Sequence, residues 1–285
     1  MRKRKLFLDG IRAFLIFGVL AFIVVPLYWT LKISLSPERE IRSLPMTWIV
    51  SKLNFKNYED IALSSEKAVG AAFTFKRGLI NSLSISITST VLTVFFGSLA
   101  AYAIARLKVR FGQVMTFFVL LTQMLPPILL VIPLYVLGNH LGLLNTKTIL
   151  VISYMALNLP LSIWIMRGVF QDPPASIEES ALVDGCGRLG ALFRIVLPMS
   201  GPALFTAGLF VFNSSWNEFL FALVFTSDLR AKTMTVAMAE MIGRFRTDYG
   251  LMATSGILGS ILPLMFVAFF QRYLVSGITG GAVKQ

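Results

Sequence analysis

The chain has 285 residues, of which 56% are hydrophobic and only 14% are charged, whereas a soluble domain carries about 25% charged residues. This composition and the mean hydropathy of +0.76 predict a membrane protein. The formal net charge of +12 does not indicate nucleic-acid binding, because several Lys and Arg residues lie beside long apolar runs instead of forming one basic stripe.

Six apolar stretches are long enough to cross a membrane. A crossing helix needs about 20 mostly apolar residues, because the hydrocarbon core is about 30 Å thick. Open sheet edges are excluded from lipid by their unpaired backbone groups, so each stretch is predicted to be helical. The sequence thus predicts an all-α, polytopic membrane protein with six transmembrane helices. In chain order the stretches are 13–31, 80–105, 113–137, 148–166, 202–225 and 249–271.

Basic residues at the N-terminus predict the orientation. Residues 2–5 read Arg-Lys-Arg-Lys and precede the first apolar stretch. This resembles a signal peptide, but the run is long and 32–34 offers no convincing cleavage site, so a retained anchor is expected. The positive-inside rule keeps 2–5 in the cytoplasm, and six crossings then return the C-terminus to that side. Arg106, Lys108 and Arg110 agree, whereas Lys76 and Arg77 fall on the outer side.

This topology divides the chain into three regions. Residues 1–79 form an anchor helix and an outer segment, residues 80–275 form the transmembrane core, and residues 276–285 form a cytoplasmic tail. The core contains a long cytoplasmic loop at 167–201. Further outer segments are expected at 138–147 and 226–248.

The segment 172–198 within that loop is predicted to form two short helices. Ser176 followed three residues later by Glu179 matches a capping box, which begins a helix after Pro173 and Pro174. Gly185 is suited to the left-handed conformation that ends it. A second amphipathic stretch, broken by Pro198, places four apolar residues at helical spacing. They are Leu189, Leu192, Phe193 and Val196.

Two interpretations of this helix pair remain open. It is either a knob that receives force from a cytoplasmic partner or an ordinary interfacial pair lying flat on the lipid surface. Composition does not separate docking from lying flat.

The spacing within the loop resembles a known family. Glu179-Ser180-Ala181, three residues, Gly185, nine residues and then 195–198 (Ile-Val-Leu-Pro) is similar to the EAA loop of ABC importer permeases, whose pattern is EAA, three residues, G, nine residues, IxLP. Ser180 stands where Ala is usual, and Cys186 stands where a small residue, often Ala, follows the Gly. Both residues are small, so the close helix packing that the motif implies is preserved.

The resemblance extends over about 53–285 and points to the carbohydrate-uptake, or maltose-type, branch. In particular the chain resembles the shorter of the two permease subunits, which implies the type I ABC importer permease fold. The segments that carry this resemblance are 99–103 with Arg106, 132–135, 142–146, 216–219 and 281–284.

The resemblance implies a set of partners and a division of labour. Two ATP-binding subunits, a second permease subunit and an extracytoplasmic sugar-binding protein are expected, with membrane lipid around the helices. The loop is expected to dock in a cleft on an ATPase, and the tail at 280–284 is a further candidate to approach the ATPases. The coupling residues carried over are Glu179, Ala181, Gly185, Ile195, Leu197 and Pro198, with Glu178, Asp184 and Arg188 as nearby charged candidates.

Polar residues at membrane depth are candidates for the translocation pathway. Glu218 lies near the outer end of the fifth stretch, where a charge is costly. Asn213, Trp216 and Asn217 have the spacing i, i+3, i+4 and therefore share one face, which suits stacking and hydrogen bonding with a sugar. The alternative is interhelical packing, with the polar groups satisfied between subunits. In the resembling family the other permease supplies most sugar contacts, which favours this alternative.

Prolines interrupt most of the predicted spans. Pro126 and Pro127, with Gln123 one turn before them, are candidates for a gating site because each proline removes a backbone donor and can kink its helix. Transmembrane helices also tolerate proline without any such role.

Motifs for chemistry are missing from the sequence. No G-x-x-x-x-G-K-[ST] motif occurs, so ATP and Mg are expected on partner ATPase subunits, and no cofactor of its own is expected for this chain. A single Cys, Cys186, excludes an intrachain disulfide framework. A single His, His140, argues against a histidine-rich metal site or a Ser/His/Asp triad. We therefore expect neither catalytic nor metal-binding residues.

The sequence therefore predicts a permease subunit of a binding-protein-dependent ABC importer for a sugar or oligosaccharide. Another polar solute, such as glycerol phosphate or a polyol, fits the same motifs. An ion-coupled secondary transporter is disfavoured, because Glu218 is the only acidic residue within a predicted span. A membrane-embedded enzyme would need a convergent set of acid, base or metal groups. The motifs do not name the sugar.

Overall fold

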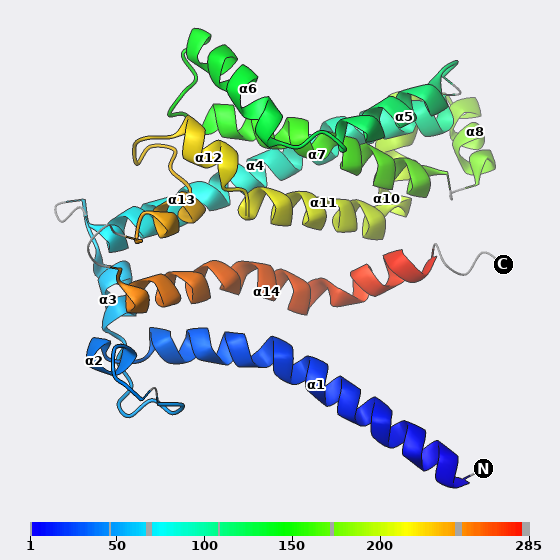
Figure 1. Ribbon diagram of the computed structural model, residues 1–285. Helices are drawn as coiled ribbons and strands as arrows, with labels where there is room; N and C mark the ends of the chain where they lie inside the picture. The colour runs from blue at the N-terminus through cyan, green and yellow to red at the C-terminus, as the bar shows by residue number, and fades with distance from the viewer. Residues whose placement is uncertain are drawn as a thin grey trace. The chain divides into compact units, whose positions relative to one another are not determined.

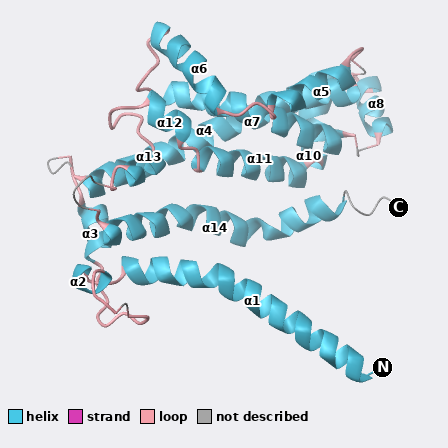
Figure 2. Ribbon diagram, in the orientation of Figure 1, coloured by secondary structure: helices cyan, strands magenta, loops and turns pink. Residues whose placement is uncertain are grey.

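The computed structural model describes residues 2–45, 47–66, 70–107, 109–171, 174–242 and 247–280 (Figure 1). Lys108 and the tail at 281–285 lie outside the described residues. Within the described part of the chain every named element is a helix (Figure 2), and a single antiparallel bridge joins Ile242 and Thr247. The predicted all-α class is confirmed.

The chain divides into two compact units. The first consists of Met1–Lys76 with Ala237–Ile261, and the second consists of Arg77–Val236 with Leu262–Gln285. The first unit contains the 33-residue helix α1 (Arg2–Ser34), which has Pro26 inside it. Its other elements are α2 (Glu38–Ile41), α3 (Lys56–Leu63) and the first part of α14 (Tyr249–Gly280).

The second unit holds most of the helices. Three of them are long: α4 (Ala71–Arg106, which begins in the first unit), α7 (Lys147–Phe170) and the remainder of α14. The shorter ones, in chain order, are α5 (Gly112–Thr122), α6 (Ile128–His140), α8 (Ala175–Val183), α9 (Arg188–Ala191), the π-helical turn η1 (Leu192–Val196), α10 (Leu197–Met199), α11 (Gly201–Trp216), α12 (Leu220–Phe225) and α13 (Met234–Ala239).

Four described helices are long and apolar enough to cross a membrane. They correspond to the first, second, fourth and sixth predicted spans. Their crossing segments are Asp9–Ser34, Ala71–Arg106, Lys147–Phe170 and Tyr249–Phe269.

The expectation of six continuous helices is corrected at the third and fifth spans. The third consists of two short helices, α5 and α6, separated by 123–127. Pro126 and Pro127 lack the backbone N–H that would continue the hydrogen-bond ladder, and each disfavours the helical region for the residue before it. The fifth span is divided between α11 and α12, which are separated by Asn217, Glu218 and Phe219.

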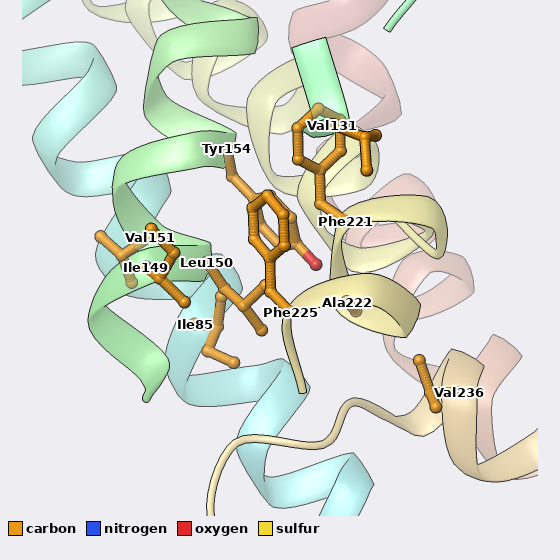
Figure 3. Close-up of a cluster of buried hydrophobic side chains, with 10 residues drawn as sticks. All are labelled: Ile85, Val131, Ile149, Leu150, Val151, Tyr154, Phe221, Ala222, Phe225 and Val236. Carbon is orange, nitrogen blue, oxygen red and sulfur yellow. The ribbon is translucent and has the colours of Figure 1, made fainter. Parts of the chain in front are cut away.

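Two apolar clusters hold the second unit together at opposite ends of α7. The first, the α7 N-terminal cluster, joins α4, α6, α7, α12 and α13 (Figure 3). Its buried members are Ile85, Val131, Ile149, Leu150, Val151, Tyr154, Phe221, Ala222, Phe225 and Val236. The second, the loop cluster, joins α4, α7, η1 and α11. Its buried members are Ala101, Tyr102, Ile163, Met166, Phe170, Leu192, Val196 and Ala207.

In the first unit, a polar network holds the segment after α1. The side chains of Lys32 and Glu40 are only 3% and 9% exposed, and their charged atoms lie 3.3 Å apart. The Glu40 carboxylate also accepts hydrogen bonds from the hydroxyls of Thr47 (2.8 Å) and Ser51 (2.6 Å). The hydrogen bonds from Ser51 and Thr47 lower the pKa of Glu40 from 4.5 to about 2. The network thus fixes the segment after α1 through the ionised carboxylate.

We predict that Glu40→Gln loosens residues 35–54, because an amide offers one acceptor oxygen and leaves Lys32 without its charge partner. Since folding lowers the pKa of Glu40, the wild-type contribution is complete above pH 4.5 and is lost as the pH falls toward about 2. Hydrogen–deuterium exchange of this segment at several pH values measures both effects.

Glu38→Gln is the matched control for this prediction. Glu38 pairs with Arg42 at 3.2 Å on the surface of the same helix, where both side chains are about half exposed, and such pairs contribute little. Equal loosening by the two variants would contradict the assignment.

Candidate functional site

The loop between α7 and α11 begins with α8 at one end of α7 (Figure 1). The predicted capping box is wrong. The N-cap of α8 is Pro174, which has extended dihedral angles (φ −57°, ψ 130°) and makes no side-chain cap hydrogen bond. Ser176 lies inside the helix, where its carbonyl accepts from the Ser180 hydroxyl. The helix starts earlier because Ala175, the residue after Pro174, is the strongest helix former.

The C-terminus of α8 is a Schellman motif centred on Gly185. The N–H of Cys186 donates to the carbonyl of Ala181 at 2.9 Å, and the N–H of Gly185 donates to that of Leu182 at 3.2 Å. Gly185 has φ +86°, a conformation that L side chains rarely adopt. The prediction that Gly185 ends this helix in the left-handed conformation is confirmed.

Pro198 does not break the second half of the loop, contrary to the prediction. Helical structure runs from Arg188 through η1 and α10 to Met199. The backbone widens to π-helical geometry at Leu192–Val196, directly before the proline. Such widening accommodates a ring that lacks an N–H and would clash in a regular α-helix. The chain then bends by 84° into α11.

The apolar face of the loop packs against the helix bundle. Ala191, Leu192 and Val196 are at most 1% exposed, and Leu192 and Val196 belong to the loop cluster with residues of α4, α7 and α11. An interfacial helix pair lying flat on lipid would direct these side chains into the membrane surface. The packing therefore favours the knob over the flat pair.

The opposite face of the loop is exposed. Glu179, Asp184, Gly185, Arg188 and Pro198 are exposed, and Ala181, Ile195 and Leu197 are partly buried. Two large apolar side chains accompany the charges, since Val183 is 87% exposed and Leu189 is 62% exposed. Eight of the nine coupling candidates thus lie wholly or partly at the surface, and the ninth, Glu178, does not.

Glu178 points into the protein. Glu178 as a whole is 6% exposed. Its carboxylate accepts a hydrogen bond from the Tyr102 hydroxyl of α4 at 2.5 Å. Arg106 Nε of α4 lies 3.8 Å from the same carboxylate, and Arg188 Nη1 of α9 lies 3.6 Å from it. Sequence reasoning did not place Tyr102 or Arg106 at this site. A tyrosine and an arginine one turn apart at the end of a predicted span were the available signal.

The break between α5 and α6 is attached to α7. Gln123 donates a hydrogen bond from Nε2 to the Leu157 carbonyl at 2.9 Å. Pro126 and Pro127 are exposed at the break itself. Gln123 therefore satisfies a carbonyl of α7 at the place where the third span is interrupted.

Asn213, Trp216 and Asn217 do not present one accessible face, and the burial of Trp216 agrees with the packing alternative for that residue. Trp216 is 1% exposed, and its ring stacks on Phe212 with centroids 5.6 Å apart. Asn213 and Asn217 are exposed and bonded to each other, since Asn217 Nδ2 lies 3.1 Å from Asn213 Oδ1. A large apolar ring gains more by burial than by lining a polar path. The accessible polar surface here consists of the two asparagines.

Glu218 caps the second helix of the broken fifth span. Its Oε1 accepts from the N–H of Phe221 at 2.9 Å, and its Oε2 accepts from the N–H of Ala222 at 3.2 Å. The first turn of α12 would otherwise leave these donors unsatisfied. A negative charge is also favourable at a helix N-terminus. This position accounts for an acidic side chain near membrane depth.

Residues 93–280 match the model of the family described as binding-protein-dependent transport system inner membrane component. The chain belongs to this family. The matched region includes the loop, both broken spans and the C-terminal part of α4, but not α1. Its apolar helices are accordingly those of an inner-membrane transport component.

Members of the family that resemble this chain are transport permeases. A sulfoquinovosyl glycerol transport system permease of Agrobacterium fabrum is 32% identical over 91% of this chain and 88% of the relative. A trehalose/maltose transport system permease of Thermococcus litoralis is 34% identical over 96% and 97%. A trehalose transport system permease of Mycobacterium tuberculosis is 34% identical over 93% and 94%.

A solved structure shares the fold. The chain aligns with the crystal structure of a bacterial ABC transporter involved in the import of the acidic polysaccharide alginate with a TM-score of 0.78. The alignment covers 93% of this chain and 96% of that chain at 20% identity. The chain therefore shares its fold with a chain of that transporter.

We predict that Gly185→Ala destabilises the helix end of α8 by about 1–2 kcal/mol, the cost of a left-handed conformation for an L residue. A Cβ at Gly185 meets no atom within 4 Å, so the cost comes from the backbone alone. Gly187→Ala is the matched control, because a Cβ there is equally unhindered and φ is −72°. Hydrogen–deuterium exchange across 175–191 should increase only for Gly185→Ala, and an equal response would contradict the turn.

We predict that Glu218→Ala impairs the protein more than Glu218→Gln does. The amide oxygen of glutamine retains one acceptor for the N–H groups of Phe221 and Ala222, whereas alanine retains none. Loss of a cap costs about 1 kcal/mol. Thermal unfolding of the purified complex measures the order. Stabilities that fall equally for both variants would assign Glu218 a role in which its charge matters.

Proposed function

We propose that the chain is a permease subunit of an ABC importer that carries a sugar or oligosaccharide across the cytoplasmic membrane. The proposal is supported by relatives named for trehalose, maltose and a glycosyl glycerol, each of which aligns along most of its length. A single observation supports the proposal that the loop couples to ATPases. The apolar face of the loop is buried, while Glu179 and Gly185, which has a left-handed conformation, remain at the surface.

Six crossings follow if each broken pair counts as one span. The pairs are α5 with α6 and α11 with α12, and broken helices are a common way to build a solute path in transporters. Residues 2–5 then place the N-terminus in the cytoplasm, and the tail 276–285 lies on the same side. The anchor and outer segment are 1–79, and the permease core is 80–275 with its coupling loop at 167–201.

Two separate ATP-binding subunits supply the energy in this proposal, and they hold ATP and Mg. Closure of the ATPases displaces the exposed face of the loop, where Glu179 and Asp184 lie beside the apolar Val183. Because Leu192 and Val196 are buried in the loop cluster, the loop moves together with the helix ends that it contacts. A second permease and an external binding protein complete the importer.

The translocation path is proposed to run past the two breaks. Asn213 and Asn217 offer exposed amide groups beside the break after Trp216, and Pro126 and Pro127 mark the other break. Amides hydrogen-bond hydroxyl groups as both donors and acceptors. Trp216 is buried below these two amides. Glu218 caps α12, the helix that follows.

A polyol or glycerol phosphate remains the runner-up substrate class, and an ion-coupled secondary transporter is the rival mechanism. Among the predicted spans, the acidic group is Glu218, whose two oxygens are occupied by backbone N–H groups. This occupation disfavours ion coupling through that side chain. Uptake driven by an ion gradient in ATP-depleted vesicles would support the rival.

We predict that the tagged chain, expressed with its native neighbouring proteins, co-purifies with an ATPase pair and a second permease in mild detergent. Glu179→Lys should lose the ATPases, because reversing a charge within a docked interface costs about 2 kcal/mol or more. Mass spectrometry of the bound proteins measures the outcome.

Glu59→Lys is the matched control. It makes the same charge change at an exposed residue of α3, in the outer segment. It should retain the ATPases. A wild-type chain that purifies without ATPase or second permease would refute the proposed function.

A further inference from the structure

The coupling loop and α4 are not adjacent along the chain, so they are linked only by noncovalent contacts. Along the chain, α8 lies between α7 and α9, and α4 is adjacent to neither α8 nor α9. The contact of α8 with α4 passes through Glu178, which is separated from Tyr102 by 76 residues. Any movement that the loop transmits to α4 must therefore pass through side chains.

At this link the Glu178 carboxylate is surrounded by one hydroxyl and two guanidinium groups. Tyr102 and Arg106 lie one turn apart on α4 and both face the Glu178 carboxylate, while Arg188 approaches it from α9. A buried carboxylate is costly unless it is paired and hydrogen-bonded. With three partners from two segments, Glu178 is held in one position, and the Tyr102 ring is itself packed in the loop cluster.

The other end of α4 is attached to an outer segment. Asn81 donates from Nδ2 to the carbonyls of Leu229 and Lys232, both at 3.0 Å. The N–H of Met234 donates to the Ser82 hydroxyl at 2.9 Å. A Cβ at Gly78 would come within 2.9 Å of the Thr233 carbonyl, so the two backbones are in direct contact.

α4 is an unbroken helix of 36 residues between these two attachments. The distance from Asn81 to Arg106 along the helix axis is about 37 Å, which is more than the thickness of the hydrocarbon core. The third and fifth spans are interrupted, and a break absorbs movement. Among the described spans of this unit, α4 thus joins the loop to the segment 229–234 without a hinge.

We propose that Glu178 is a positioning residue that fixes the coupling loop to α4, and that α4 transmits movement of the loop to the outer segment 229–234. Glu178 therefore acts within the permease, whereas Glu179 faces the ATPase. The inference rests on the proposed function and assigns separate roles to these two adjacent carboxylates.

The test uses the complete transporter in proteoliposomes and measures solute transported per ATP hydrolysed. Tyr102→Phe removes the hydroxyl and retains the packed ring, and Glu178→Gln removes the charge at constant size. Both should retain ATPase subunits and ATP hydrolysis while the transport ratio falls by about fivefold or more, the lower end of couplings between distant sites. The double variant should be no worse than the stronger single variant, because both break the same contact.

Two further variants make the result specific. Tyr135→Phe is the matched control, since it removes a hydroxyl from a half-exposed ring in α6. It should transport normally. Asn81→Ala cuts the outer attachment and should lower the ratio without any change in the loop.

A distance measurement separates transmission from general damage. Cys186 is the single native cysteine, so a Cys186→Ser background accepts spin labels at the exposed Ile177 of α8 and at the exposed Leu107. In the wild-type background the distance between these labels should stay narrow and unchanged between nucleotide-free and ATP-bound complexes. In Tyr102→Phe it should broaden when ATP binds.

Unchanged transport ratios in both Tyr102→Phe and Glu178→Gln would overturn the inference and leave the proposed function intact. Loss of the ATPases from Glu178→Gln, with a normal ratio in Tyr102→Phe, would instead assign Glu178 to the docking face. Failure of the wild-type chain to bind ATPases would refute the proposed function itself.

Discussion

Backbone groups at membrane depth must find hydrogen-bond partners within the protein, and the arrangement of this permease depends on that constraint. Two of its predicted spans are interrupted, and in both a side chain supplies what the interruption removes. The Glu218 carboxylate accepts the first N–H groups of α12, and the Gln123 amide bonds a carbonyl of α7 beside the proline pair. Breaks of this kind are stable only where such polar partners replace solvent.

The uninterrupted helices provide the frame for these breaks. α7 contributes Leu150 and Tyr154 to one apolar cluster and Met166 and Phe170 to the other. Because both clusters are densely buried, displacement at one end of α7 is not absorbed by loose packing. The broken spans lie beside this frame, so the frame supplies rigidity while the breaks supply places where the helices bend.

The pattern of apolar stretches predicted the helical class and the location of the four described helices that are long and apolar enough to cross a membrane, because hydrocarbon thickness sets their length. The interruptions were not predicted as breaks. The apolar composition around Asn217–Phe219 is the same whether or not the helical backbone hydrogen bonds continue through these residues. The αL conformation of Gly185 was predicted because few other residues adopt it. The capping box failed because Ser176-x-x-Glu179 also fits one turn inside a helix. The partners of Glu178 were missed because they come from a helix far away in the sequence.

Glu178 and Glu179 illustrate how neighbouring residues of one type can have different roles. Successive side chains of an α-helix point about 100° apart, so a helix packed on one side directs one carboxylate inward and the next outward. The buried carboxylate is bound to Tyr102, Arg106 and Arg188, and the exposed one remains accessible to a partner. In the proposed mechanism, docking and internal transmission are carried by different side chains on the same turn of α8. The loop would then bind an ATPase through one face and move a membrane helix through the other, and substitution at Glu178 or at Glu179 would separate the two functions.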